Sequence, residues 1–530
     1  MTYPRSGLIS TPARISTVKL TVPLNAPNYP TILHALEDVA RRTPDRLALV
    51  CEDRSLTFAE HKKAVSGFAR RLRKLGVEGE RVAVLMTNCL EMPVAILGAM
   101  AAHAYVAPMN PNYSDSEMTP LLKDTGPKVI VTLPEFFPRV SKIAAAMGIP
   151  HVLVVGEGDD TLTAWLAAGS DELPQPLPQS DDFAMMFFTG GTTGLPKGAE
   201  HRHRHIMAFC RLEAAFYSTL QYDKEVSLSV APLFHIFGHH HCVVHHLYIG
   251  STHVLVRQYK PDIVLAQLSK YKVSLFAGGP ATVYVGLLAA EGMKTADLSS
   301  LKICCAGGSA CSEDLLRNWS TTTGCEIYEG IGMSEGAPYA NNSDLVKRKV
   351  LSVGLPPPET DVEVVDLITG TEVLPAYERG EIRVRGPQMV SSYRNRPEET
   401  AHTIRDGWLY TGDIGYFDNE GYLFVVDRKK ELIISGGYNI HPREVDEVLN
   451  SHPDTFEVAT VGMKDTFRGE IPVAFVVLKP GREVTGDDLI AYCKQRLVDY
   501  KVPKRIEFRD ALPKTGPGKI DKLKLRGLRD

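Results

Sequence analysis

Residues 189–198 combine the residue types that bind phosphate. The segment reads Thr-Gly-Gly-Thr-Thr-Gly-Leu-Pro-Lys-Gly and follows an apolar run at 183–188 that is typical of a strand. Glycines let backbone amides approach phosphate oxygens, hydroxyls donate hydrogen bonds, and the lysine supplies charge. The order is not that of the P-loop GxxxxGK[ST], because Lys197 precedes Gly198 and no serine or threonine follows. Alone, the segment predicts a phosphate site, with a flexible surface turn as the alternative.

A second segment could carry different chemistry. Residues 332–336, Gly-Met-Ser-Glu-Gly, match the GxSxG nucleophile elbow of serine hydrolases. An elbow requires a helix directly after the serine, and residues 336–342 are a poor helix start because they include glycine, proline and two asparagines. A serine hydrolase is therefore the remote alternative, and labelling by a serine-directed fluorophosphonate would test it.

Composition excludes several classes of protein. The chain has 530 residues, enough for two or more domains, and a net charge of -4, which gives no overall attraction to nucleic acid. The nine cysteines form no CxxC pair, so reduced thiols and a cytoplasmic location are expected. The N-terminal residues lack the apolar core of a secretory signal. The most apolar stretch, residues 93–108, is shorter than the roughly 20 residues that span a bilayer, so we expect a buried helix leading into a strand and no integral membrane segment.

Alternating strand and helix patterns must position these segments. An amphipathic helix is predicted from residue 56 to 76, strands at 81–86, 128–132 and 151–155, and a helix at 138–147. This alternation favours parallel α/β layers. Strands at 380–385, 412–417 and 422–427, the last two joined by the turn sequence Asp-Asn-Glu-Gly, predict antiparallel pairing before residue 430. Helices at 442–449 and 486–497 and strands at 456–462 and 471–478 then predict a compact C-terminal domain.

Six segments, in order along the chain, carry a family resemblance. They read FFTGGTTGLPKG, PLFHIFG, EGIGMSEG, YTGD, DRKKELIISGGYNIHPREVDEVL and PKTGPGKI. The chain resembles the adenylate-forming superfamily of acyl-CoA synthetases, firefly luciferases and peptide-synthetase adenylation domains, and within it the AMP-forming acid–CoA ligases. The resemblance implies a large N-terminal region, residues 1–428, of two parallel-type α/β subdomains and an antiparallel β subdomain. A small mobile α+β domain, residues 429–530, would turn about a hinge near Lys430.

The resemblance also implies a reaction in two steps. The acid and ATP would give acyl-AMP and pyrophosphate, and acyl-AMP and coenzyme A would then give acyl-CoA and AMP. By position, the catalytic residues are Lys519, Lys197, His235 and Glu335. Glu335 would bind Mg2+ with help from Thr189. The ATP and AMP site would comprise Thr189, Gly190, Gly191, Thr192, Thr193, Lys197, Gly308, Ser309, Ala310, Glu329, Gly330, Ile331, Gly332, Met333, Ser334, Asp413, Arg428 and Lys519.

The chemistry explains several of these residue types. Attack of a carboxylate on the α-phosphate builds negative charge, which Mg2+ and a flexible ammonium at Lys519 would stabilise. Asp413 suits the ribose because a carboxylate can accept from two vicinal hydroxyls. Thiol attack needs the space that Lys519 occupies, and a domain rotation would replace it with the coenzyme A residues Ser435, Gly436, Gly437 and Tyr438. Neutralising Lys519 would stop the first step, so a lysine acetyltransferase is a conceivable partner.

The acid itself is predicted only as a class. The positions that line the acyl pocket in relatives carry His235, Phe237, His241, Gly308, Cys311, Gly332, Pro338 and Tyr339. This mixture of small, apolar and aromatic residues favours a medium-sized apolar acid, whether medium-chain fatty, alicyclic or aromatic, over acetate. Neutral or protonated imidazoles could instead receive a distal carboxylate of an acid with a second charged end. A ligase that loads a carrier protein is the alternative activity, although no carrier domain follows residue 530.

Two departures from the family pattern are visible. Ile331 stands where relatives carry an aromatic residue that stacks on adenine. Without this stacking, worth about 0.5 to 1.5 kcal/mol, ATP is expected to bind more weakly. Nine histidines lie between residues 201 and 246, without an HExxH motif or a cysteine partner. Histidines 201, 203 and 205 are predicted on one face of a strand or in a loop, and a metal site is the weaker interpretation.

Overall fold

A six-stranded sheet forms the first layer of the N-terminal region. The computed structural model describes residues 20, 27–189, 196–429, 431–435, 438–515 and 519–527. The strand order is β6-β5-β3-β4-β7-β8, and all neighbours are parallel except β7 and β8. The strands are β3 Arg81–Leu85, β4 Tyr105–Met109, β5 Val129–Thr132, β6 His151–Val154, β7 Phe183–Phe188 and β8 Gly198–Arg202. The helices are α2 Phe58–Lys74, α3 Glu91–Ala101, α4 Asp115–Thr125, α5 Phe137–Met147 and α6 Leu162–Ala168.

An eight-stranded sheet forms the second layer, in the order β14-β13-β12-β11-β9-β10-β1-β2. Its inner pairs are parallel, and β2 and β14 join its edges antiparallel. The strands are β1 Leu47–Cys51, β2 Arg54–Thr57, β9 Val226–Ser229, β10 Thr252–Leu255, β11 Leu275–Gly279, β12 Ile303–Ala306, β13 Ile327–Met333 and β14 Gly336–Asn341. The helices are α1 Ile32–Arg42, α7 His203–Ala214, α8 Ile236–His239, a π-helix His240–His245, α9 His246–Ile249, α10 Pro261–Lys270, α11 Ala281–Ala289, a 3-10 helix Glu291–Lys294 and α12 Glu313–Thr323.

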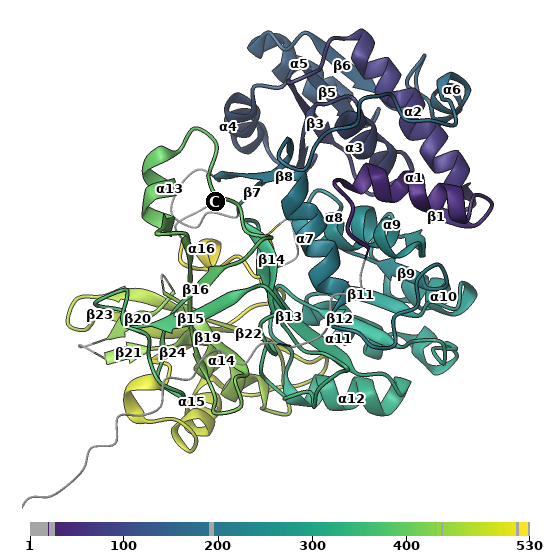
Figure 1. The fold of residues 1–530 in the computed structure, drawn as a ribbon. Coiled ribbons are helices and arrows are strands. Elements are labelled where there is room, and N and C mark those ends of the chain that lie inside the picture. The colour runs from purple at the N-terminus through teal and green to yellow at the C-terminus, as the bar shows by residue number, and fades with distance from the viewer. Residues whose placement is uncertain are drawn as a thin grey trace, which may run out of the picture.

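The third sheet is antiparallel, as the sequence predicted. It contains β15 Asp361–Val365, β16 Gly380–Arg385, β17 Ile404–Arg405, β18 Trp408–Phe417 and β19 Leu423–Arg428, with the short helix α13 Pro397–Thr403 beside it. In Figure 1 this sheet, drawn in green, lies next to β13 and β14 of the second sheet. Its last strand leads directly to the boundary predicted for the C-terminal domain.

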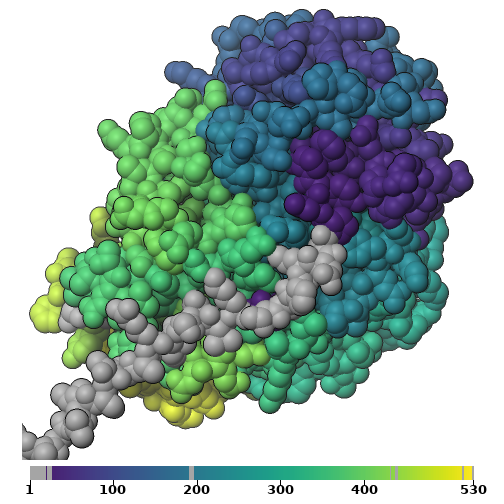
Figure 2. Space-filling view, viewed as in Figure 1, coloured from purple at the N-terminus to yellow at the C-terminus, as the bar shows by residue number. Residues whose placement is uncertain are grey.

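The C-terminal region has its own sheet and its own apolar core. The strands are β20 Ile433–Ser435, β21 Tyr438–Ile440, β22 Thr455–Asp465, β23 Gly469–Leu478 and β24 Arg505–Phe508. The helices are α14 Pro442–Asn450, α15 Gly486–Lys494, a 3-10 helix Asp499–Lys501 and α16 Lys522–Leu525. The helix predicted to reach Leu497 ends at Lys494, because the amides of Arg496 and Leu497 both donate to the Cys493 carbonyl and turn the chain. Figure 2 shows this yellow region against the green antiparallel sheet.

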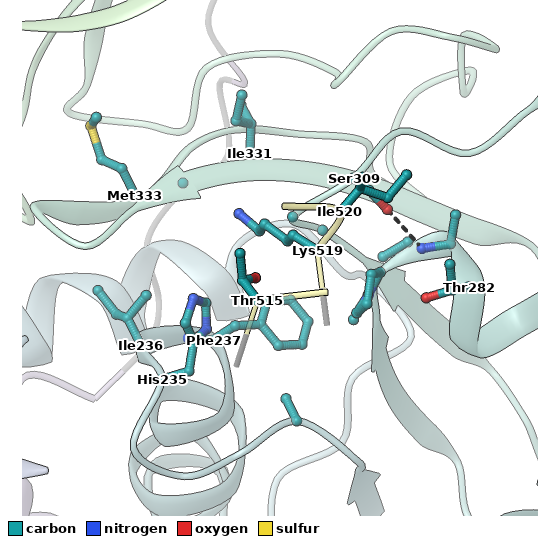
Figure 3. A pocket seen from close by; sticks show the side chains of 18 of the residues that line it. His235, Ile236, Phe237, Thr282, Ser309, Ile331, Met333, Thr515, Lys519 and Ile520 are labelled. Carbon is teal, nitrogen blue, oxygen red and sulfur yellow. Dashed lines mark hydrogen bonds between the residues drawn. The ribbon is translucent and has the colours of Figure 1, made fainter. Parts of the chain in front are cut away.

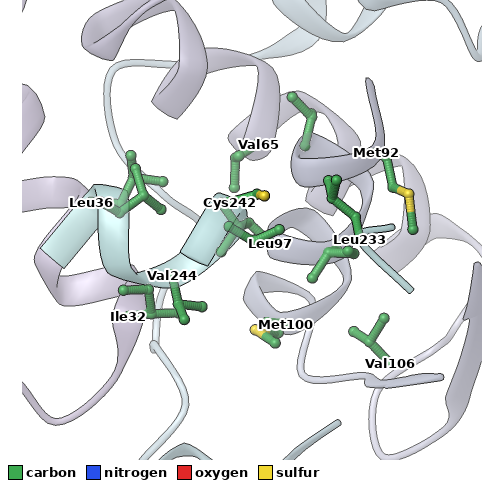
Figure 4. Packing of buried hydrophobic residues seen from close by; sticks show 14 of the residues in the cluster. Ile32, Leu36, Val65, Met92, Leu97, Met100, Val106, Leu233, Cys242 and Val244 are labelled. Carbon is green, nitrogen blue, oxygen red and sulfur yellow. The ribbon is translucent and has the colours of Figure 1, made fainter. Parts of the chain in front are cut away.

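The helix α3 lies at the centre of the largest apolar cluster. Every residue of this helix is buried, which confirms the predicted buried helix and the strand after it. A Cβ on Gly98 would lie 2.8 Å from Phe68 Cδ1, so the glycine allows α2 to pack closely against α3. In Figure 4 side chains of α3 meet those of α1, α2 and the π-helix, which include Ile32, Leu36, Val65, Met92, Leu97, Met100, Cys242 and Val244. Within the described part of the chain, no helix combines the length and apolar character needed to cross a membrane.

Candidate active site

A single cavity of about 3680 Å³ brings together most of the predicted site residues. The carboxyl ends of β11, β12 and β13 border it on one side, and residues of the C-terminal region, including Lys479, Lys514 and Lys519, border it on the other. Figure 3 shows Lys519 between Ile331 and Met333 on β13 and the side chains of His235 and Phe237. The site is therefore shared by the two parts of the chain.

Lys519 reaches the junction between the predicted adenine and acyl subsites. A Cβ on Gly308, which has a φ of +86°, would lie 3.2 Å from Lys519 Cε and 3.7 Å from its Nζ. The left-handed backbone at residue 308 favours a glycine, and an added Cβ would crowd the lysine stem by a few tenths of an ångström. A bridge between Lys514 and Ile520, together with a 2.7 Å hydrogen bond from the Thr515 amide to the Lys519 carbonyl, holds the segment that presents the side chain.

His235 lies close to this ammonium. Burial, with a smaller effect of the Lys519 charge, lowers the pKa of His235 to about 3. Its Nδ1 accepts from the Phe237 amide at 3.3 Å, which caps α8 and fixes the ring. Because Nδ1 accepts from this amide, the neutral ring carries its proton on Nε2, which can donate a hydrogen bond to a substrate carboxylate.

A carboxylate and an arginine are paired on the two strands that end the N-terminal region. The β18 and β19 register places Asp413 opposite Arg428. Arg428 Nε donates to Asp413 Oδ1 at 2.9 Å, and the Tyr339 hydroxyl donates to Asp413 Oδ2 at 2.9 Å. The Asp413 charge raises the pKa of Arg428. The pair borders the cavity in a fixed orientation.

Glu335 and Lys197 converge at another end of the cavity. The Tyr393 hydroxyl donates to Glu335 Oε1 at 2.5 Å, and Lys197 Nζ lies 5.2 Å from the centroid of the Tyr393 ring. Burial raises the pKa of Glu335, and the Tyr393 hydrogen bond opposes that shift. The amide of Lys197 donates to Thr189 Oγ1 at 3.3 Å, which joins the two ends of the glycine-rich segment.

The remaining predicted phosphate residues, Gly190, Gly191, Thr192 and Thr193, lie outside the described residues. Tyr393 was not predicted, because its segment matches no motif and only its contacts connect it to Glu335.

The predicted adenine strip follows β12 and β13. Ser309 Oγ accepts from the Ala281 amide at 3.0 Å, and Glu329 Oε1 accepts from the Cys311 amide at 2.9 Å. A Cβ on Gly330 would lie 2.2 Å from Asn341 Oδ1, so this glycine is required for β13 to pack on β14. The strip, which lines the cavity, consists of Gly308, Ser309, Ala310, Glu329, Gly330, Ile331, Gly332, Met333 and Ser334.

The serine-hydrolase alternative finds no support in this geometry. The strand β14 begins at Gly336, so a strand and not a helix follows Ser334. The hydrogen bond between His201 Nε2 and Ser334, at 2.8 Å, is made with the carbonyl oxygen of the serine. Ser334 is thus part of a β13–β14 turn.

Seven of the eight predicted acyl residues line the cavity, and Tyr339 does not. His235, Phe237, His241, Gly308, Cys311, Gly332 and Pro338 border it. Tyr339 is fully buried in the core of the antiparallel sheet and reaches the site only through its hydroxyl on Asp413. Its assignment to the acyl pocket is therefore wrong, because alternation along β14 turns its ring away from the cavity.

Ser435 and Tyr438, the two described residues of the predicted coenzyme A segment, do not border the cavity in this arrangement. Ser435 is buried at the end of β20, and Tyr438 is 57% exposed and stacks on Tyr500 with 4.6 Å between ring centroids. Gly436, Gly437 and Lys430 lie outside the described residues. The cavity is thus formed with Lys519 in it and with the described residues of this segment elsewhere.

The histidine cluster is mainly a packing feature. The prediction of one strand face or one loop for histidines 201, 203 and 205 is wrong, because β8 ends at Arg202 and α7 begins at His203. His239 is fully buried against Phe187, and burial lowers its pKa to about 3, so it is neutral. Among the described residues, no group of three or more histidine, cysteine or acidic side chains is placed to hold a metal ion.

Comparisons with known proteins show the family of this chain. The model of the AMP-binding enzyme family matches residues 36–394, and that of the AMP-binding enzyme C-terminal domain matches residues 444–519. A long-chain-fatty-acid–CoA ligase of Bacillus subtilis is 36% identical over 93% of this chain and 94% of its own. A feruloyl-CoA synthase of an Amycolatopsis species is 36% identical over 92% and 96%.

A solved structure is similar over almost the whole chain. The anthranilate CoA ligase AuaEII, in complex with anthranoyl-AMP, has a TM-score of 0.88 and 28% identity, covering 96% of this chain and 99% of its own. Its large N-terminal and small C-terminal domains match the fold described above. The chain therefore belongs to the AMP-binding enzyme family, the adenylate-forming superfamily, and within it to the acid–CoA ligases that use ATP, Mg2+ and coenzyme A.

Proposed function

We propose that this AMP-forming acid–CoA ligase activates a medium-sized acid with an apolar body, of the medium-chain fatty, alicyclic or aromatic class. The observation that carries the proposal is that Phe237, His241, Phe209 and Cys305 line the cavity together with His235. The ring centroid of His241 lies 4.4 Å from that of Phe237 and 6.0 Å from that of Phe209. Acetate would leave this apolar space unfilled, and most of the available burial energy would be lost. The relatives named for a long-chain fatty acid and for feruloyl support an acid with an extended apolar body.

In the first step the acid carboxylate would attack the α-phosphorus of ATP, and pyrophosphate would leave. Lys519, at the junction beside His235 and Gly308, would stabilise the charge that develops on the α-phosphate. The neutral His235 would orient the attacking carboxylate. Lys197 would hold the pyrophosphate end, where its position beside Tyr393 brings it close to Glu335.

Asp413 would hold the ribose hydroxyls. Its two oxygens are already oriented by Arg428 and Tyr339, so little further ordering is needed when the nucleotide binds. Each carboxylate oxygen has a second lone pair that can accept from a hydroxyl. Arg428 would assist from the adjacent strand.

The Mg2+ site of the family would be formed by Glu335, with Thr189. A carboxylate oxygen is the ligand that Mg2+ prefers, and the buried Glu335 borders the cavity, so the residues present fit the ion. Bound there, Mg2+ would neutralise charge on the ATP phosphates.

The second step would follow a rotation of the C-terminal domain about Lys430. Lys519 fills the junction in the present arrangement, so the coenzyme A thiol could reach the acyl-adenylate only after it leaves. The segment from Ser435 to Tyr438 would then border the pantetheine tunnel.

Acylation of Lys519 by an acetyltransferase would block the first step alone, and an enzyme with acetyl-lysine at 519 that kept its adenylation activity would refute this regulation.

A panel of acids tests the proposed substrate class. Pyrophosphate release would be measured for acetate, octanoate, cyclohexanecarboxylate, benzoate and cinnamate, each with and without coenzyme A. We expect one of the larger acids to give the highest kcat/KM and an acyl-CoA product. A highest value for acetate would contradict the substrate class, and adenylate formation without any thioester would favour a ligase that loads a carrier protein.

A further inference from the structure

Glu213, near the end of α7, is a buried carboxyl that the mechanism above does not use. It is 5% exposed and borders the cavity. Among the residues that the structure describes, none gives its carboxyl a hydrogen bond or an ion pair. The other buried carboxyls of the site do have such partners: Glu335 has Tyr393, Asp413 has Arg428, and Glu329 has the Cys311 amide.

Glu213 lies away from the reacting end of the cavity. Lys519 contacts Gly308, just beyond the carboxyl end of β12. Cys305 is three residues earlier, up to about 10 Å back along the strand at about 3.3 Å per residue. Glu213 and Cys305 both border the cavity, and Tyr217, four residues after Glu213, places its hydroxyl 3.2 Å from Cys305 Sγ. Burial raises the pKa of the Cys305 thiol, and the Glu213 carboxyl raises it further. Glu213 therefore belongs to the inner wall of the acyl pocket.

Most of the other side chains at this inner wall are apolar or already hydrogen-bonded, and His241 is a further polar side chain that lines the cavity. Phe209, one helical turn before Glu213 and on the same face, contacts His240 with 4.0 Å between ring centroids. The Tyr217 hydroxyl accepts from Asn341 Nδ2 at 2.8 Å and lies 3.2 Å from Cys305 Sγ. The carboxyl of Glu213 is thus, together with the His241 imidazole, a polar group that the described part of this wall presents to a ligand.

Burial raises the pKa of Glu213 to about 8, so at neutral pH the group is mostly a neutral acid that can both donate and accept. Its titratable neighbours are neutral as well. Burial raises the pKa of the Cys210 and Cys305 thiols and of the Tyr217 hydroxyl, and lowers the pKa of His240 and of His241.

We infer that Glu213 selects acids that carry a hydroxyl group at the end opposite their carboxylate, by exchanging hydrogen bonds with that hydroxyl. A plain hydrocarbon end would leave the carboxyl buried and unpaired, which is unfavourable. A second carboxylate would place an anion beside a group that burial already keeps neutral. An ammonium would bring three donors to a wall that offers one carboxyl. This inference rests on the proposed function and narrows its substrate class.

Matched pairs of acids test the inference in the wild-type enzyme. The pairs are 4-hydroxycinnamate with cinnamate, and 8-hydroxyoctanoate with octanoate, compared by kcat/KM for acyl-CoA formation. We expect the hydroxylated member to be preferred at least about tenfold in the pair whose length suits the pocket, since a hydroxyl matched to a buried partner carries this much discrimination. Equal values, or a preference for the plain acid, in both pairs would overturn the inference.

Two variants separate recognition from a structural role. Glu213→Gln keeps a group that donates and accepts, and it should keep the preference. Glu213→Leu removes the polar group at similar volume, and it should reverse the ratio toward the plain acid. The ratio within a pair is the measured quantity, because a general loss of packing would lower both values alike. An unchanged ratio in Glu213→Leu would refute the inference, and stabilisation of each variant by ATP in a thermal melt controls for folding.

The proposed substrate class and the proposed role of Glu213 are contradicted by different results. If none of the acids forms a thioester, the proposed substrate class is wrong. If the plain acids are activated as well as their hydroxylated partners, the proposed class stands and the role of Glu213 falls.

Discussion

Replacing Lys519 by methionine should separate the two half-reactions. The stem of Lys519 packs against Gly308, where a Cβ would lie 3.2 Å from Cε, and methionine keeps an unbranched stem of similar length there. What the variant loses is the charge beside the reacting phosphate. Two unit charges about 4 Å apart at an effective dielectric of about 20 interact by about 4 kcal/mol. Removal of one preorganised electrostatic contact typically costs about 2.7 to 4 kcal/mol, or about 10²- to 10³-fold in kcat.

The two steps can be assayed independently. Acid-dependent exchange of pyrophosphate into ATP reports adenylation, and release of AMP from synthetic acyl-AMP and coenzyme A reports thioester formation. We expect Lys519→Met to lose about 10²- to 10³-fold in the exchange assay and to stay within about twofold of wild type in the second. Because Lys519→Ala also removes the stem, it serves as the control for packing. An equal loss in both assays would refute the assignment of Lys519 to the first step alone.

Three further predictions follow from contacts in the site. Gly308→Ala adds a Cβ at a φ of +86° and 3.2 Å from Lys519 Cε, so adenylation should fall while thioester formation from acyl-AMP is spared; unchanged pyrophosphate exchange would contradict the packing described. Tyr393→Phe removes the 2.5 Å hydrogen bond on Glu335, worth about 1.5 to 3 kcal/mol for a charged acceptor, and should raise the Mg2+ concentration needed for half-maximal adenylation; an unchanged Mg2+ titration would separate Tyr393 from the metal site. The pKa of Glu213 is raised from 4.5 to about 8, so its contribution to stability is complete below pH 4.5 and is lost as the pH rises toward 8. Thermal melts of the ligand-free enzyme should therefore show wild type losing stability relative to Glu213→Gln between pH 5 and 8, and parallel curves would show that the carboxyl is not desolvated.

The elements of the fold were largely predictable because their local signals agree with the tertiary structure. The buried helix before β4 and the turn between β18 and β19 were both visible from composition and turn residues. Boundaries were less predictable: the helix expected to reach Leu497 ends at Lys494, where two amides share the Cys493 carbonyl. The spacing of apolar residues in a sequence does not show that two amides share one carbonyl acceptor.

The site residues likewise fall into those that a sequence motif predicted and those that only the structure shows. Lys519 and Asp413 stand in recognisable segments, and the structure places both at the cavity. Tyr393 and Glu213 stand in no motif and become visible only through burial and through the partners they have or lack. Tyr339 is the opposite case. It stands at a position that lines the acyl pocket in relatives, but alternation along β14 turns its ring into the core. The sequence motifs thus predicted the residues of the adenylation reaction better than the residues that select the acid.

The contact between Lys519 and Gly308 has a consequence for the kinetic order of the reaction. The glycine lies in the region that matches the AMP-binding enzyme family and the lysine in the region that matches its C-terminal domain. In the proposed second step the incoming thiol would need the space that the ammonium occupies here. If Lys519 leaves only after adenylation, as proposed, pyrophosphate would depart before the thiol reacts, and the enzyme would alternate between a form that reacts with ATP and a form that reacts with coenzyme A. Initial-rate plots with ATP and coenzyme A as varied substrates should consist of parallel lines, the pattern of a ping-pong sequence.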